Sequence, residues 1–243
     1  WKTDQMLGGL PGIMNLAAAS GEDLGQVSDI VTDALTAFNM TADQAGRFAD
    51  VLAQASSNSN TNVAMMGATF QKVAPVAGAL GYSVEDVSLA IGLMANASIK
   101  SEVAGTSLKT ALANMAKPTK QMKEYMDKYG ISLTNADGSM KSFREVVDNL
   151  RSSLGGLSET EQVAAATAIL GKESFAGMLA IVNASEADFQ KLSDSVNNSA
   201  GAAERMAQIK LDNFQGKVTL LQSAVEGLQI ALGDALLPTF TEG

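Results

Sequence analysis

Cysteine and histidine are both absent from the 243 residues. Without cysteine, the chain has no disulfide framework and no thiol chemistry. Without either residue type, it also lacks Cys/His metal sites, histidine general bases and Ser-His-Asp triads. The residues therefore favour a helical structural or interaction module, and we predict no catalytic, cofactor-binding or metal-binding residue.

Aromatic residues are also scarce, at 5% of the chain, although 46% is apolar. Small residues, above all Ala, Gly and Ser, dominate. A β-sandwich needs Val, Ile, Thr and aromatic residues at period two, so this composition favours closely packed helices. The longest strongly apolar run without charge, from Val87 to Ile99, is too short to span a bilayer, and we expect no membrane contact.

Positive charge is in deficit. Seventeen Lys and Arg residues face 26 Asp and Glu residues, which gives a formal net charge of −9. An acidic chain is repelled by phosphates, so we predict no tight nucleic-acid binding.

Helix starts are marked by Ser or Thr followed three residues later by an acid or Gln, the pattern of a capping box. The pairs are Ser20/Asp23, Thr41/Gln44, Ser83/Asp86, Ser142/Glu145, Ser158/Glu161 and Ser185/Asp188. Glycines at 81, 130, 155–156 and 171 can end helices in the left-handed conformation. These signals predict helices near 22–38, 41–55, 62–80, 84–97, 101–116, 119–129, 142–155, 158–171, 173–184 and 185–198. The helix at 84–97 is apolar on two faces, which predicts a central position.

One β-like interruption is predicted within residues 131–141. Ile131, Leu133 and Met140 flank the turn sequence Asn135–Gly138, whose Asp-Gly suits a tight hairpin turn. The turn resembles the middle of a calcium-binding loop. However, Leu133 would hold the first ligand position and Arg144 the position of the bidentate glutamate. We therefore interpret the segment as a plain turn.

The last 40 residues carry an apolar heptad stripe that predicts one long helix from Ala207 to Ala235. Its members are spaced 4-3-4-3, and they are Ala207, Leu211, Phe214, Val218, Leu221, Val225, Leu228, Leu232 and Ala235. This helix could pair with another copy of the chain or pack along its own bundle. The predicted fold is all-α: a compact multi-helix bundle over residues 1–200 and a long C-terminal heptad helix over 201–243.

Three short sequence motifs occur in the order typical of one family. They are VAPVAGALG at 73–81, LMANASIKSEVAGTSLK at 93–109 and NMAKP at 114–118. Together they resemble the core domain of phage tail tape measure proteins of the TP901 type. The departures are small: Ser98 stands where Gly is usual, and Glu102 and Val103 lie in a variable gap.

The resemblance implies a parent protein in the lumen of a long phage tail. Such a protein sets tail length as a scaffold for polymerising tail tube protein and leaves ahead of the DNA. It also implies tail tube protein, tail-tip or baseplate proteins and tail assembly chaperones as partners, and the host bacterial cytoplasm as the place of assembly. We expect this segment to be a folded head, with the heptad helix leading into the extended, oligomeric tape.

Two alternatives remain at this point. Glu173-Ser174 resembles the Glu-Ser of lytic transglycosylases, where a carboxylic acid protonates a glycosidic oxygen. That family expects Gly-Leu-Met-Gln downstream, whereas here the nearest equivalent, Gly92–Ala95, lies upstream and lacks the Gln. The second alternative is a helical interaction module unrelated to phages.

Overall fold

The computed structural model describes residues 3–213 and 217–227, and the regular elements of this part of the chain are all helices, without a β-strand. The elements are α1 (Thr3–Ser20), α2 (Leu24–Ala37), the 3-10 helix η1 (Ala42–Gln44), α3 (Ala45–Ser57), α4 (Val63–Ala79), α5 (Val84–Asn96), α6 (Ser101–Ala116), α7 (Lys120–Tyr129), α8 (Phe143–Leu154), α9 (Glu159–Leu170), α10 (Phe175–Val182), α11 (Glu186–Asn197) and α12 (Ala202–Asp212). A further helical segment covers 217–227. The all-α prediction is confirmed.

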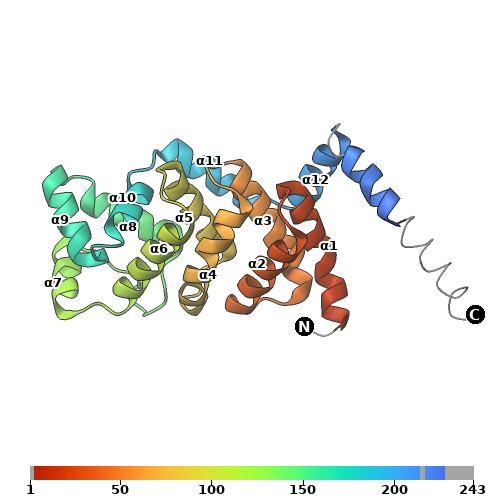
Figure 1. Cartoon of the computed structure of the whole chain (residues 1–243). Helices are drawn as coiled ribbons and strands as arrows, with labels where there is room; N and C mark the ends of the chain where they lie inside the picture. Colours follow the sequence, from red (N-terminus) through yellow and green to blue (C-terminus); the bar gives the residue numbers. More distant parts are fainter. Residues whose placement is uncertain (1–2, 214–216, 228–243) are drawn as a thin grey trace, which may run out of the picture.

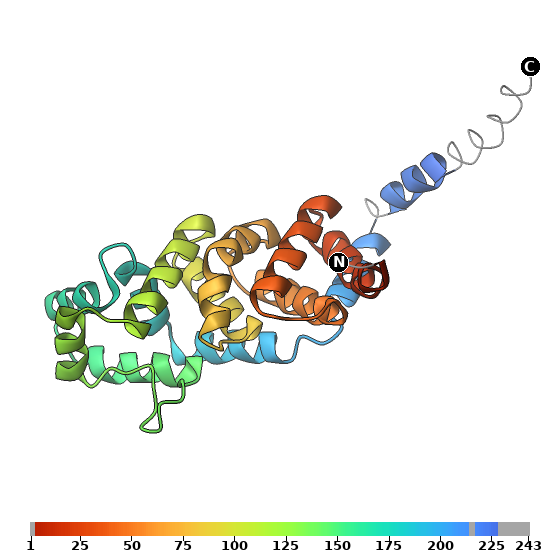
Figure 2. The same ribbon diagram turned by 90° about the horizontal axis from the view of Figure 1, so that it is seen from below.

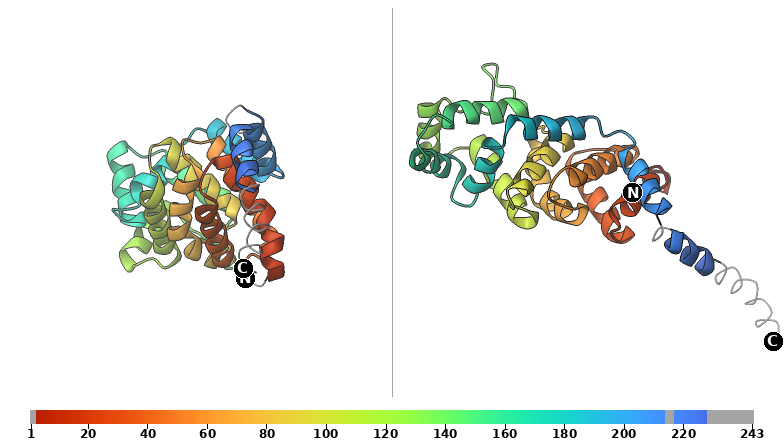
Figure 3. Two further views of the ribbon diagram at one scale, coloured as in Figure 1. Left: turned by 45° about the vertical axis from the view of Figure 1, so that its right-hand side comes forward. Right: turned by 90° about the horizontal axis from the view of Figure 1, so that it is seen from above.

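The helices form an elongated array that begins at α1 and reaches α7 and α9 at its far end (Figure 1). Along it, α1 packs on α3, α2 on α4, and α4 on α6. The chain then returns: α11 lies along α5 and α3, and α12 packs against α1 and α3 (Figure 2). The last helices therefore bridge segments that are distant in sequence, as the two views of Figure 3 also show.

A carboxylate fixes the point where the returning chain meets the start of the array. Asp50 of α3 accepts hydrogen bonds from the backbone N–H groups of Gly201 (2.7 Å) and Ala203 (2.9 Å). Both groups belong to the first turn of α12, where backbone N–H groups lack helical partners and the helix dipole favours negative charge. A side chain of α3 therefore caps a helix some 150 residues further along the chain.

The centre of the array is α5, as predicted from its two apolar faces. Val87, Ile91 and Met94 on one face and Leu89 and Leu93 on the other are all buried. The helix contacts α3, α4, α6, α10 and α11. An all-round apolar helix is stable only where neighbours cover every side, and the array supplies them.

Most predicted helix starts are confirmed. Complete capping boxes form at Ser83 and Ser142. The Gln44 and Glu161 side chains accept from the backbone N–H groups of Thr41 and Ser158, and the Ser185 hydroxyl caps the N–H of Asp188. The start at Ser20 is wrong, because Ser20 ends α1.

At that helix start it is Asp23 that caps α2, by accepting from the N–H of Gln26 at 3.1 Å. Among the stops, Gly81, Gly130 and Gly171 have positive φ, whereas Gly155 is right-handed at φ −65°.

The interruption at 131–141 is less regular than predicted. It contains a single antiparallel bridge, between Thr134 and Met140, and no strand among the described residues. Backbone hydrogen bonds from Asn135 N–H to the Ser139 carbonyl and from Lys141 N–H to the Leu133 carbonyl close the loop. The segment therefore turns back on itself, but too few residues pair to make a hairpin.

The continuous helix predicted from Ala207 is interrupted within the stripe. Helix α12 ends at Asp212, and Asn213 is extended, with φ −75° and ψ 168°. Ala207 is buried in the array, so the early part of the stripe packs on its own bundle. Phe214, Leu228, Leu232 and Ala235 lie outside the described residues.

Helix α1 is not among the helices predicted from the sequence. It contains Gly8, Gly9, Gly12 and Pro11, which are residue types typical of loops. It is the 18-residue helix on which α3 and α12 pack.

Candidate functional site

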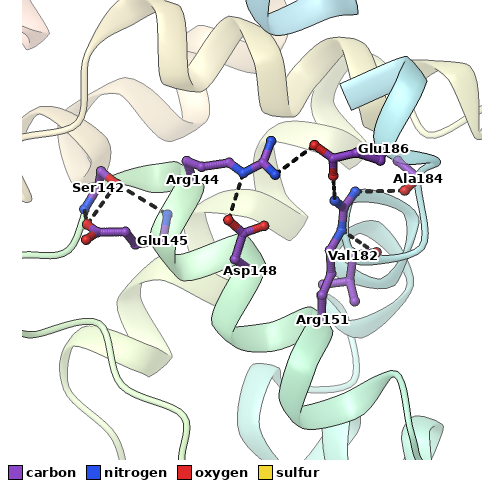
Figure 4. Close-up of polar contacts among 8 residues, drawn as sticks. All are labelled: Ser142, Arg144, Glu145, Asp148, Arg151, Val182, Ala184 and Glu186. Atoms are coloured by element: carbon purple, nitrogen blue, oxygen red, sulfur yellow. Dashed lines mark hydrogen bonds and ion pairs between the residues drawn. The ribbon is translucent and has the colours of Figure 1, made fainter. Parts of the chain in front are cut away.

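The most connected polar group of the described residues joins α8 to the start of α11. Arg144 donates to Asp148 (2.8 Å) and to Glu186 (2.7 Å), and Arg151 donates to the second Glu186 oxygen at 2.8 Å (Figure 4). We call these four side chains the Arg–Glu latch. The positions 144, 148 and 151 follow the helical repeat, so one face of α8 presents all three.

Arg151 also holds the turn between α10 and α11. Its Nε donates to the carbonyl of Val182 at 2.9 Å, and its Nη2 donates to the carbonyl of Ala184 at 2.7 Å. These carbonyls belong to the end of α10 and the residues after it, where helical partners are missing. The guanidinium groups of Arg144 and Arg151 also lie 4.5 and 5.1 Å from the ring of Phe189.

The electrostatics of the Arg–Glu latch suit a structural role. The hydrogen bond from Arg144, followed by the positive charges of Arg144 and Arg151, lowers the pKa of Glu186. A carboxyl group held as carboxylate cannot serve as a general acid at neutral pH. The Glu186 side chain is 60% exposed, so its ion pairs orient the helices more than they add free energy of folding.

The glutamate of the transglycosylase alternative has none of the surroundings of a catalytic acid. Glu173 is exposed between α9 and α10 and makes no hydrogen bond or ion pair to other described residues. Glycosidase acids are held in apolar pockets opposite a second carboxylate. The neighbouring Ser174 is buried, and its carbonyl accepts from the hydroxyl of Ser107 at 3.1 Å. We find no observation that favours this alternative.

The loop at Asn135–Gly138 is a plain turn in the structure. Ser139 donates to the Asp137 carboxylate from its hydroxyl (2.6 Å) and its backbone N–H (2.9 Å), and these bonds lower the pKa of Asp137. Gly138 has φ +86°, which glycine accommodates without strain. Across the described ranges, no three His, Cys, Asp or Glu side chains gather as metal ligands would.

No single helix within 3–213 or 217–227 has the length and apolarity needed to cross a bilayer. Taken jointly, α9 and α10 meet that test, but they are bent by 119°.

Exposed apolar side chains gather near the N-terminal end of the array. On α1, Leu7, Leu10 and Met14 are 64%, 43% and 52% exposed and repeat at helical spacing. In the segment 217–227, Val218, Leu221 and Val225 of the predicted stripe are exposed as well. Aligned exposed apolar side chains are typical of surfaces that another helix covers. The spacing of Leu7, Leu10 and Met14 is the signal from which the α1 stripe could have been predicted.

Comparison with known proteins places this helical array in a family. The chain belongs to the family of phage-related minor tail proteins, whose model matches residues 1–171, and it is a structural component of a phage tail.

Over 242 residues the chain is 35% identical to the tape measure protein of Pneumococcus phage Dp-1, covering 100% of this chain and 21% of that protein. It is 23% identical over 234 residues to the probable tape measure protein of Escherichia phage P2, covering 95% of this chain and 29% of that protein. The chain thus spans less than a third of these relatives. No solved structure matches.

The resemblance to phage tail tape measure proteins is therefore confirmed. Family membership also speaks against a helical module unrelated to phages.

Proposed function

We propose that the parent protein sets tail length, as a scaffold around which tail tube protein polymerises, and leaves the tail at genome ejection. The observation that carries this proposal is the similarity along the whole chain to two proteins named as tape measure proteins. The contribution of this segment is shape and binding, without catalysis. Each of the two relatives has at least two thirds of its length outside the match, which leaves room for a measuring region elsewhere.

Tail length measured by electron microscopy tests this function. In a phage that carries the parent gene, an in-frame deletion outside these 243 residues should shorten the tail in proportion to the residues removed. A helical ruler loses about 1.5 Å per residue. Deletion of this segment should instead abolish or deform tails without rescaling them. An unchanged tail length after the deletion outside this segment would contradict the proposal that the parent protein sets tail length.

Within this scaffold, the chain up to the end of α12 acts as a folded head, and the residues after Asn213 lead into the tape, so we move the boundary expected at residue 200 to Asn213. Two observations support a folded head that extends to α12: α12 packs on α1 and α3, and Asp50 caps its first turn. The break at Asn213 is a natural joint between the head and the tape. Small-angle scattering of the chain should give a folded, elongated particle. A profile typical of a single continuous rod would contradict a folded head.

The chain forms homo-oligomers through the later part of the stripe predicted between Ala207 and Ala235, because its early part packs on the chain's own bundle. The exposed side chains of Val218, Leu221 and Val225 support this proposal, because a heptad stripe left in water is stabilised by a partner helix. Sedimentation of the Leu221→Glu/Val225→Glu variant should show monomers at concentrations where the parent chain associates. The Ser223→Glu variant is the control at an exposed position off the stripe. Equal association in all three would contradict this role.

The partners we propose are tail tube protein, tail-tip or baseplate proteins and tail assembly chaperones. The site of action is the tail lumen, after assembly in the host bacterial cytoplasm. Membership of a tail protein family supports contact with tail components in general. The immobilised chain should retain at least one of these purified proteins, and retention of none would contradict the assignment.

A further inference from the structure

A groove with an apolar floor runs between α2 and α4. Two adjoining hollows of about 440 and 490 Å3 share Ile30 and Gln71 in their lining. Ile30, Ala34, Phe70 and Ala74 line the first hollow with apolar side chains that are almost wholly buried. Gly67 lies beneath Ile30, and a Cβ there would come within 2.4 Å of the Ile30 Cδ1, so α2 and α4 pack closely at this point.

The α2 rim of this groove is acidic and lacks positive partners. Asp23, Asp29 and Asp33 line the two hollows. Asp23 caps its own helix, whereas the carboxylates of Asp29 and Asp33 make no ion pair or hydrogen bond to other described residues. The only basic residue of α4 is Lys72, and its stem lies against Gly105 of α6, on the side away from α2.

We propose that this groove binds a basic amphipathic helix of another protein. An amphipathic helix buries its apolar face between two helices, and Lys or Arg beside that face would meet the carboxylates of Asp29 and Asp33. Opposite charge on the two surfaces raises the rate of encounter and fixes orientation. The net charge of −9 favours a basic partner at longer range as well.

In a second copy of the chain, α7, α1 and the segment 217–227 do not supply such a helix. The lysine-rich helix α7 has Met126 buried, packs its inner face against α9, and carries Glu124 and Asp127 between its lysines. The exposed stripe of α1 has no Lys or Arg beside it, and the segment 217–227 has one lysine and one glutamate. We commit to a helix of a different protein as the occupant, and the inference is independent of the tape measure role.

The test uses a designed helical peptide of about 21 residues, six turns, with Leu on one face and Lys on its flanks. A second peptide carries Glu in place of Lys. Binding to the chain is measured by fluorescence anisotropy over a range of salt concentrations. The Lys peptide should bind, with affinity falling as salt rises, and the Glu peptide should not. Equal binding of both peptides would overturn the proposal, as would no binding of either.

Two double variants of equal charge change locate the site. Asp29→Lys/Asp33→Lys should weaken binding of the Lys peptide by about tenfold or more. Glu124→Lys/Asp127→Lys, on α7 at the far end of the array, should leave it within about twofold, because screening over that distance removes the effect. An equal loss of peptide affinity in the two variants would show general attraction to an acidic chain and would overturn the assignment of the groove as the binding site.

Hydrogen exchange and sedimentation complete the test. Bound peptide should slow exchange in α2 and α4 and leave α7 unchanged, and protection elsewhere would contradict the assignment. In sedimentation of the chain alone, Asp29→Lys/Asp33→Lys should not alter the oligomeric state. A change there would identify a second copy as the occupant and overturn the proposal of a different protein.

Discussion

Gly12 of α1 and Gly46 of α3 lie in direct backbone contact: a Cβ built on Gly12 would come within 2.7 Å of both the Cα and the N of Gly46. Neither of these backbone atoms can move aside as the tip of a flexible side chain can. The absence of a side chain at Gly12 is therefore what allows α1 to lie against α3. The reverse is not true, because a Cβ on Gly46 meets no atom within 4 Å.

This asymmetry predicts opposite effects for two identical substitutions. Gly12→Ala should force α1 away from α3 and lower the free energy of unfolding by about 1–3 kcal/mol. Gly46→Ala should be neutral or raise it by up to about 1 kcal/mol, because Ala favours the helix. Urea denaturation followed by circular dichroism measures both values. If Gly12→Ala proves as stable as Gly46→Ala, the close contact is not present in solution.

Arg151 should contribute more to stability than an exposed arginine. Arg151→Met leaves the carbonyls of Val182 and Ala184 without their donor, and we expect a loss of about 1–3 kcal/mol. Arg47→Met is the control, since Arg47 is 51% exposed and, among the residues that the structure describes, pairs only with Glu85, so its loss should stay below about 1 kcal/mol.

Hydrogen exchange should quicken around residues 182–186 in Arg151→Met and not in Arg47→Met. Equal stability of the two variants would show that Arg151 does not clamp the turn after α10.

The buried hydroxyl of Tyr82 should make the folded protein lose stability at alkaline pH. Burial, and to a lesser degree the charge of Asp86, raises the pKa of the Tyr82 hydroxyl from 10.0 to about 12. The unfolded chain therefore loses this proton at lower pH than the folded chain does. The stability linked to the proton is fully present below pH 10 and is lost as the pH rises toward about 12.

The Tyr82→Phe variant isolates that contribution. The hydroxyl has no hydrogen-bond partner among the described residues, so its removal at pH 7 should be neutral or stabilising by about 1 kcal/mol. Between pH 10 and about 12 the variant should lose less stability than the parent in paired urea denaturations. Parallel curves for both proteins across this window would show that Tyr82 is accessible to water.

For the transglycosylase alternative, we expect no clearing of peptidoglycan by the chain and no difference in the Glu173→Gln variant. Glu173 is exposed and lacks the apolar pocket in which a catalytic acid is held. A turbidity assay on purified cell walls, with a known lytic enzyme as positive control, makes the comparison. Clearing by the parent chain that Glu173→Gln abolishes would establish the enzyme.

The features that could be predicted from the sequence depend on interactions between residues close together in the chain. Capping boxes such as Ser83/Asp86 are set by residues three positions apart, so they could be predicted and are present. The burial of α5 followed from its own two apolar faces.

The features that the sequence did not predict depend on contacts between residues far apart in the chain or on the packing of whole helices. Helix α1 holds glycines that favour loops locally, and its helical state depends on packing against α3 and α12. The Arg–Glu latch joins α8 to α11, and no local pattern relates Arg144 to Glu186 across 42 residues. The heptad stripe predicted one continuous helix and gave no signal of the extended Asn213.

The central claim is that the chain closes on itself, with α12 returning to α1 while α7 stays at the far end. Because the chain has no cysteine, pairs of spin labels can be placed without removing native thiols. Electron–electron double resonance should give one narrow, short distance for Met14→Cys/Glu204→Cys. It should give a clearly longer one for Met14→Cys/Lys123→Cys. A broad or long distance for the first pair would contradict the closed array.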